Sequence, residues 1–157
     1  MLFAVGTYTS FGGPGVAVID AKKDKIECVA SLAAVADPTW VMQSPGKANI
    51  LYSSGAITGT KTGLVASYLW AEGRLMVLSV QETGGRACCH LCVDADESHL
   101  YAANYLDGSV SVFPLKDGKI GPCCQFQAQE VPICVHLLLS CRSISPTLIR
   151  SVGSGER

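Results

Sequence analysis

The sequence has little charge and no long apolar run. Charged residues make up 16% of its 157 residues, and 12 basic side chains nearly balance 13 acidic ones, which gives a formal net charge of −1. This balance excludes nucleic-acid binding through a broad basic surface and attachment to a membrane through a polybasic segment. No stretch approaches the ~18 apolar residues of a membrane-spanning helix, and Met1–Thr7 lacks the basic start of a signal peptide. We therefore expect a soluble cytoplasmic protein that binds neither nucleic acid nor membranes.

Motifs of several large enzyme classes are also missing. The sequence contains no Gly-x-Ser-x-Gly, no phosphate-binding P-loop and no His-Glu-x-x-His. The glycines within 12–15 belong to a hairpin loop that does not precede a helix, so they do not predict a phosphate-binding turn. No organic cofactor is expected.

The cysteines need a separate interpretation. Because secretion is not indicated, we expect reduced thiols that act as small apolar side chains, and we expect no metal site. The alternative is a metal site, because Cys88, His90 and Cys92 would share one face of a regular strand, with Cys89 on the other. The eight cysteines are Cys28, Cys88, Cys89, Cys92, Cys123, Cys124, Cys134 and Cys141.

An internal repeat is the strongest feature of the sequence. Similar segments begin at Leu2, Leu51 and Leu100, at intervals of about 49 residues. Each is followed, after a turn, by further short segments rich in Val, Ile, Leu, Tyr and Phe. Four short strands in a repeat of about 40–50 residues are typical of a β-propeller blade. The 16 glycines and 7 prolines suit such a turn-rich fold.

The repeat predicts an all-β protein built from blades of four antiparallel strands. About two and a half to three blades are expected, so the propeller is incomplete. Residues 1–128 form the partial propeller: blade 1 (2–34) lacks its inner strand, blade 2 covers 37–82 and blade 3 covers 87–128. Residues 129–157 are interpreted as a degraded start of a fourth blade and an irregular tail.

Within each blade the innermost strand is expected to come first. From the inside outward, the predicted strands of blade 2 are 37–44, 50–55, 64–69 and 75–81. Those of blade 3 are 88–94, 100–104, 109–114 and 120–125.

Three segments resemble the seven-bladed propeller lactonases, which include bacterial 6-phosphogluconolactonases. They read Val-Gly-Thr-Tyr-Thr at 5–9, Cys-His-Leu-x-Val-Asp at 89–94 and Ala-Asn-Tyr-x-x-Gly-Ser-Val at 103–110. The resemblance covers roughly residues 2–122. It implies that the full-length parent protein hydrolyses 6-phospho-D-glucono-1,5-lactone to 6-phosphogluconate in the pentose phosphate pathway. The expected partner is a small phosphorylated sugar lactone.

Five residues are candidates for this site. His90 is the predicted catalytic residue, because a neutral imidazole on an inner strand can act as a general base. Trp40 and His136 occupy related positions in the neighbouring repeats, Arg86 precedes the His90 strand, and Asn104 lies where the 100–104 strand leaves the sheet. These four are the predicted substrate-binding residues.

Each candidate also has a structural interpretation. His90 could hydrogen-bond the backbone of a neighbouring blade, Trp40 could pack between blades, Arg86 could be solvated and Asn104 could satisfy a turn. His136 lies in a segment that matches the repeat weakly.

The chain also departs from the family pattern. Gly55-Ala56 stands where the family carries an acidic residue, and 131–136 replaces a Pro-His-x-His stretch. The alternative function is therefore a non-enzymatic binding or scaffold fragment, or an inactive truncated product. Open blade edges predict self-association.

Overall fold

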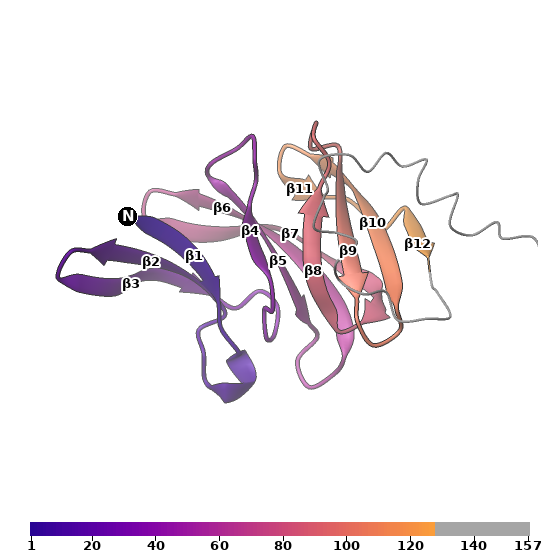
Figure 1. Ribbon diagram of the computed structural model, residues 1–157, viewed down its shortest axis with the longest axis horizontal. Helices are drawn as coiled ribbons and strands as arrows, with labels where there is room; N and C mark the ends of the chain where they lie inside the picture. The colour runs from indigo at the N-terminus through magenta and orange to yellow at the C-terminus, as the bar shows by residue number, and fades with distance from the viewer. Residues whose placement is uncertain (128–157) are drawn as a thin grey trace, which may run out of the picture.

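The computed structural model describes residues 1–127, which form three antiparallel β-sheets side by side (Figure 1). Blade 1 contains β1 (Leu2–Gly6), β2 (Val16–Lys22) and β3 (Lys25–Leu32), with a short 3-10 helix, η1 (Thr9–Phe11), between the first two. Blade 2 contains β4 (Val41–Gln43), β5 (Ile50–Ala56), β6 (Thr62–Ala71) and β7 (Arg74–Arg86). Blade 3 contains β8 (Cys88–Val93), β9 (His99–Asn104), β10 (Ser109–Lys116), β11 (Lys119–Ile120) and β12 (Gln125–Gln127).

The sheet pairings confirm the predicted fold class. Blade 2 has the order β4-β5-β6-β7, and blade 3 has the order β8-β9-β10-β11, so strands follow the chain from one edge to the other. Blade 1 has only β1-β2-β3 among the described residues, and β1 corresponds to the second strands β5 and β9. Consecutive antiparallel strands joined by short turns are the arrangement of propeller blades.

Two apolar clusters hold the sheets together face to face. One lies between blades 1 and 2 and includes Val16, Val18 and Tyr68. The other lies between blades 2 and 3 and joins Tyr52 of β5 to Phe113 of β10. The middle strands are therefore buried on both faces, which explains why β5 carries small and apolar residues instead of a polar alternation.

The outermost strand of blade 3 differs from the sequence prediction. A single strand was expected over 120–125, but β11 and β12 pair separately with the two ends of β10. Gly121 N donates to Pro114 O and Cys124 N donates to Val112 O, so this side of β10 faces both short strands. Pro114 has no N–H to donate there, and a continuous ladder is interrupted at its position.

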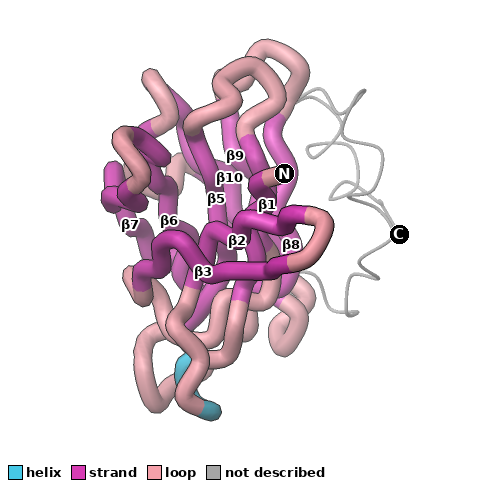
Figure 2. Tube along the Cα trace, turned by 90° about the vertical axis from the view of Figure 1, so that its left-hand side faces the viewer, coloured by secondary structure: helices cyan, strands magenta, loops and turns pink. Residues whose placement is uncertain are grey.

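The connecting loops gather at the two ends of the sheets (Figure 2). At one end lie η1, the β5–β6 loop and the β7–β8 connection. At the other end, Ser44 Oγ and Gly46 N donate to the carboxylate of Glu97, with Ser44 Oγ at 2.8 Å from Oε1. This polar contact joins blades 2 and 3 in addition to their apolar cluster.

Two sequence predictions, the fourth-blade start within 129–157 and His136, lie outside the described residues. Over residues 1–127, the structure has no helix of the length and apolarity needed to cross a membrane.

Candidate active site

Trp40 and His90 meet between the first strands of blades 2 and 3. Trp40 directly precedes β4, and His90 lies on β8; each of these strands forms an edge of its sheet. The ring centroids are 4.0 Å apart and the ring planes are inclined by 42°. His90 is only 4% exposed. The structure therefore brings these two predicted site residues into direct contact.

The ring nitrogens of this pair have no hydrogen-bond partners among the described residues. This holds for Nδ1 and Nε2 of His90 and for Nε1 of Trp40. An unsatisfied buried polar group costs about 1–3 kcal/mol, so native proteins rarely keep one without a role. The interpretation of His90 as a histidine bonded to a neighbouring backbone does not describe this geometry. Trp40 does pack between the blades, against the cluster that contains Tyr52.

Burial also sets the charge of His90. Desolvation lowers the pKa of the imidazole below its ordinary value of 6.5. The ring is therefore neutral at pH 7, with one nitrogen able to accept a proton and the other able to donate a hydrogen bond.

A β-bulge at the start of β8 determines which way these side chains point. Cys88 pairs with Asn104 and His90 pairs with Ala103, so Cys89 is an extra residue in β8. The bulge shifts the alternation: Cys88 joins the cluster between blades 2 and 3, whereas Cys92 joins a separate cluster. The predicted common face of Cys88, His90 and Cys92 is therefore wrong.

Metal binding gains no support from the described part of the chain. Residues 1–127 contain no group of three or more His, Cys, Asp or Glu side chains placed to hold a metal ion. Burial raises the pKa of the Cys88 thiol, which disfavours the thiolate form that a metal would bind.

Thr39 fixes the relative position of the two strands that carry the stack. Its Oγ1 donates to the carbonyl of Cys88 at 3.0 Å and accepts from the Ser54 hydroxyl at 2.9 Å. These bonds hold the residue before Trp40 against the start of β8, two residues before His90. Sequence reasoning missed Thr39, because a threonine that bridges two blades has no local signature.

Arg86 is the last residue of β7 and precedes the first residue of β8 by two positions. It is exposed, and no carboxylate within residues 1–127 forms an ion pair with it. The backbone of Lys61 lies beside the residue that follows Arg86, since Ala87 N donates to Lys61 O at 2.8 Å. Two exposed cations thus share this end of the sheets, and the sequence prediction included only Arg86.

Asn104 is buried beside the same connection. Its Nδ2 donates to the hydroxyls of Ser109 and Ser111, both at 3.0 Å, while its Oδ1 has no partner among the described residues. The predicted alternative, a bond to turn backbone, is replaced by bonds to side chains of β10. Whether Asn104 contacts a substrate stays a prediction.

Gly85 leaves space for Asn104, and we expect the Gly85→Ala substitution to destabilise the protein. A Cβ atom at Gly85 would lie 2.4 Å from Asn104 Cγ and Nδ2 and 2.6 Å from Ser109 Oγ. Overpacking of this kind costs about 1–3 kcal/mol. Urea unfolding measures the loss. Gly46→Ala is the control, because its Cβ would come no closer than 3.4 Å to Glu97; equal losses in the two variants would contradict the expected collision.

Comparisons with known proteins agree with this fold. A 6-phosphogluconolactonase of Bacillus subtilis (strain 168) is 33% identical over 117 residues, which are 72% of this chain and 33% of that protein. Among solved structures, the periplasmic gluconolactonase of Pseudomonas aeruginosa superimposes with a TM-score of 0.72 at 24% identity, over 82% of this chain and 38% of that one. A protein from Bacteroides fragilis NCTC 9343 gives a TM-score of 0.66 at 28% identity, over 78% and 35% of the two chains.

The chain spans about a third of the length of these relatives. A family model described as lactonase, 7-bladed beta-propeller, matches residues 2–135. The match covers most of the sequence, and the described sheets have the strand order of propeller blades. The chain therefore belongs to the seven-bladed β-propeller lactonase family.

Proposed function

We propose that this chain carries part of the site of a lactone hydrolase whose substrate is 6-phospho-D-glucono-1,5-lactone. The observation that carries the proposal is the contact between the partly buried Trp40 and the buried His90, which leaves three ring nitrogens with no partner in residues 1–127. The relative of Bacillus subtilis named 6-phosphogluconolactonase supports the choice of substrate class. The product is 6-phosphogluconate, and the reaction is a step of the pentose phosphate pathway.

In this proposal His90 is the general base. The neutral imidazole takes a proton from a water molecule as the water oxygen attacks the lactone carbonyl carbon. The carbonyl π electrons move to the carbonyl oxygen, and the indole N–H of Trp40 donates a hydrogen bond to the oxyanion. When the carbonyl forms again, the bond from carbon to the ring oxygen breaks, and the imidazolium returns the proton to that oxygen. No cofactor takes part in this sequence.

The substrate phosphate requires cations, and Arg86 is assigned to it. Its lack of an ion pair among the described residues leaves the guanidinium available for bidentate contact with phosphate oxygens. Asn104 and His136 remain proposed substrate-binding residues. The proposed location is the cytoplasm, since a charged phosphorylated sugar does not cross membranes freely.

Proton release during lactone opening tests the proposal on the purified chain. Turnover is expected above the spontaneous rate, and the non-phosphorylated glucono-1,5-lactone is expected to show a higher KM because it lacks the phosphate. Turnover equal to the spontaneous rate, with a folded sample, would rule out the proposal for this polypeptide and favour a non-enzymatic role.

A further inference from the structure

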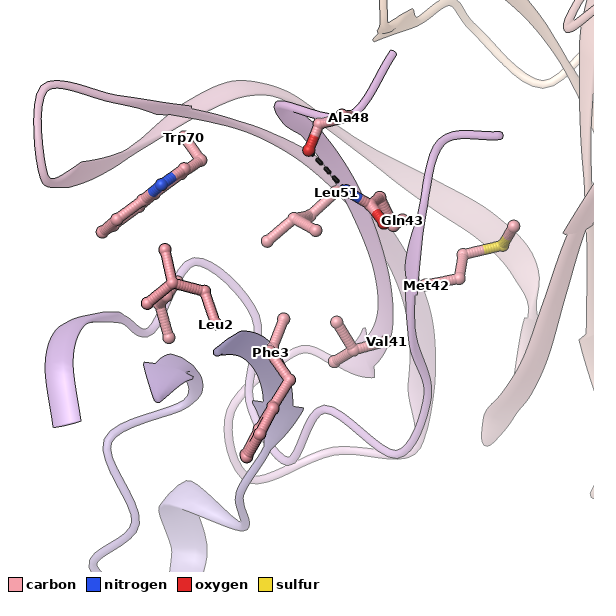
Figure 3. Close-up of a pocket in the computed structure, with 10 residues that line it drawn as sticks. Leu2, Phe3, Val41, Met42, Gln43, Ala48, Leu51 and Trp70 are labelled. Atoms are coloured by element: carbon pink, nitrogen blue, oxygen red, sulfur yellow. Dashed lines mark hydrogen bonds between the residues drawn. The ribbon is translucent and has the colours of Figure 1, made fainter. Parts of the chain in front are cut away.

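Trp40 precedes a short strand whose side chains alternate between two interfaces. β4 has three residues; Val41 joins the cluster between blades 1 and 2, whereas Trp40 and Met42 pack against the cluster between blades 2 and 3. Figure 3 shows Val41 and Met42 on opposite sides of the strand, and at its far end Gln43 Nε2 donates to Ala48 O. The β4–β5 register begins only at Val41, so the position of Trp40 depends on bonds outside this register.

Two bonds from Ser54 of β5 fix the backbone around Trp40. Ser54 N donates to Trp40 O at 3.0 Å, and the Ser54 hydroxyl is 2.9 Å from Thr39 Oγ1. Ser54 is fully buried, so the packing of blade 2 sets its position. Thr39 Oγ1 donates its proton to the carbonyl of Cys88 at 3.0 Å, because a carbonyl can only accept. The Ser54 hydroxyl must therefore donate to Thr39, which gives this chain of bonds a single direction.

The start of β8 needs support from outside its own strand. Ala87 has a φ of +54°, a left-handed conformation that alanine rarely adopts, and Cys89 is the extra residue of the bulge two positions later. Such departures from regular geometry persist where the surrounding structure holds them. Backbone bonds tie Ala87 to the β5–β6 loop and to the loop after β9. Thr39 holds the intervening Cys88, so the direction in which His90 leaves the bulge depends on this threonine.

We propose that Thr39 is a positioning residue which, together with Ser54, sets the contact between the rings of Trp40 and His90. Its consequence for catalysis rests on the proposed function, in which His90 is the base and Trp40 donates to the oxyanion. The ring centroids are 4.0 Å apart, so a shift of one ring against the other moves both groups that act on the lactone carbonyl. A misplacement of about 1 Å can lower a rate about 10²-fold.

Tryptophan fluorescence tests the contact without any substrate. Trp70→Phe leaves Trp40 as the one tryptophan of the chain, and a protonated imidazole beside an indole quenches its emission. The drop in emission as the pH falls through the pKa of His90 therefore measures the contact, and His90→Gln should abolish the drop. Thr39→Val, which keeps the shape but loses the hydroxyl, should reduce the drop, whereas Thr39→Ser should retain it.

Thr60→Val is the matched control. Thr60 Oγ1 donates to Ile57 O at 3.0 Å and accepts from Thr62 N at 3.1 Å, so the same change removes two bonds of a threonine within the β5–β6 loop. It should leave the quenching unchanged. Thr39 is exposed, so we expect Thr39→Val to fold, and urea unfolding checks this. Full quenching in Thr39→Val, or an equal loss in both variants, would overturn the proposal.

Kinetics with the phosphorylated lactone, measured with Trp70 in place, separate this inference from the proposed function. Thr39→Val should lower kcat about tenfold or more with little change in KM, and Thr39→Ser should restore kcat. Reduced quenching in Thr39→Val with no turnover by any form of the chain would reject the lactonase proposal while confirming that Thr39 sets the ring contact. Reduced quenching with an unchanged kcat would refute Thr39 as a positioning residue for the reaction.

Discussion

Replacement of His90 by glutamine should lower kcat/KM for lactone hydrolysis by about 10²- to 10⁴-fold, the usual contribution of a general base. Glutamine retains hydrogen-bonding groups but cannot take a proton from water. Initial rates of proton release with the phosphorylated lactone measure the effect. Because His90 is 4% exposed and its ring contacts that of Trp40, unfolding is measured in parallel, so that lost activity is not confused with lost structure.

The pH dependence gives a second readout of the same role. A general base works in its deprotonated form, so the rate falls as the pH drops through its pKa. Burial lowers the pKa of His90, which places the acid limb of kcat/KM below pH 6.5. The residual activity of His90→Gln should lack this limb. An acid limb above pH 6.5 in the unmodified protein would contradict the assignment.

His99→Gln is the matched control. His99 lies at the start of β9, where its Nδ1 is 3.0 Å from Asp94 Oδ2, and it has no role in the proposed site. Its replacement should leave kcat/KM unchanged. If His90→Gln shifts only the unfolding midpoint and leaves the rate intact, His90 is a packing residue.

The repeat made the blades predictable, because strand order follows from local spacing alone. The recurrence at Leu2, Leu51 and Leu100 gave the sheet order that the structure confirms. It could not give interruptions that depend on a neighbouring strand. Pro114 divides the outermost strand of blade 3 only because its missing N–H faces that strand.

The candidate site shows the same limit. The repeat placed Trp40 and His90 at related positions of neighbouring blades, and in the structure their rings are in contact. The bulge at Cys89, which changes the face of the following residues, has no signal in the sequence. The contacts of Thr39 and Gly85 depend on which residues of another strand lie opposite, so they could be identified only from the folded chain.

Phe113→Ala should cost about 3–5 kcal/mol of the free energy of unfolding, the usual loss for a buried phenylalanine. Phe113 is 0% exposed and belongs to the cluster that joins blade 3 to Ile50 and Tyr52 of blade 2. Domains of this size are stable by only about 5–15 kcal/mol, so the variant approaches the limit of folding. Urea unfolding followed by circular dichroism measures the change, and Phe113→Leu, which preserves most of the volume, should lose less.

Tryptophan fluorescence can show whether the blades unfold together. Both tryptophans, Trp40 and Trp70, belong to the blade 2 region, whereas Phe113 lies on β10 of blade 3. If the shared cluster couples the blades, Phe113→Ala shifts the fluorescence midpoint as much as the circular dichroism midpoint. Ile26→Ala, at a residue that is 75% exposed, should move neither midpoint appreciably. A fluorescence midpoint that stays fixed while the dichroism midpoint falls would mean that each blade unfolds separately, as nearest-neighbour stability in repeat proteins allows.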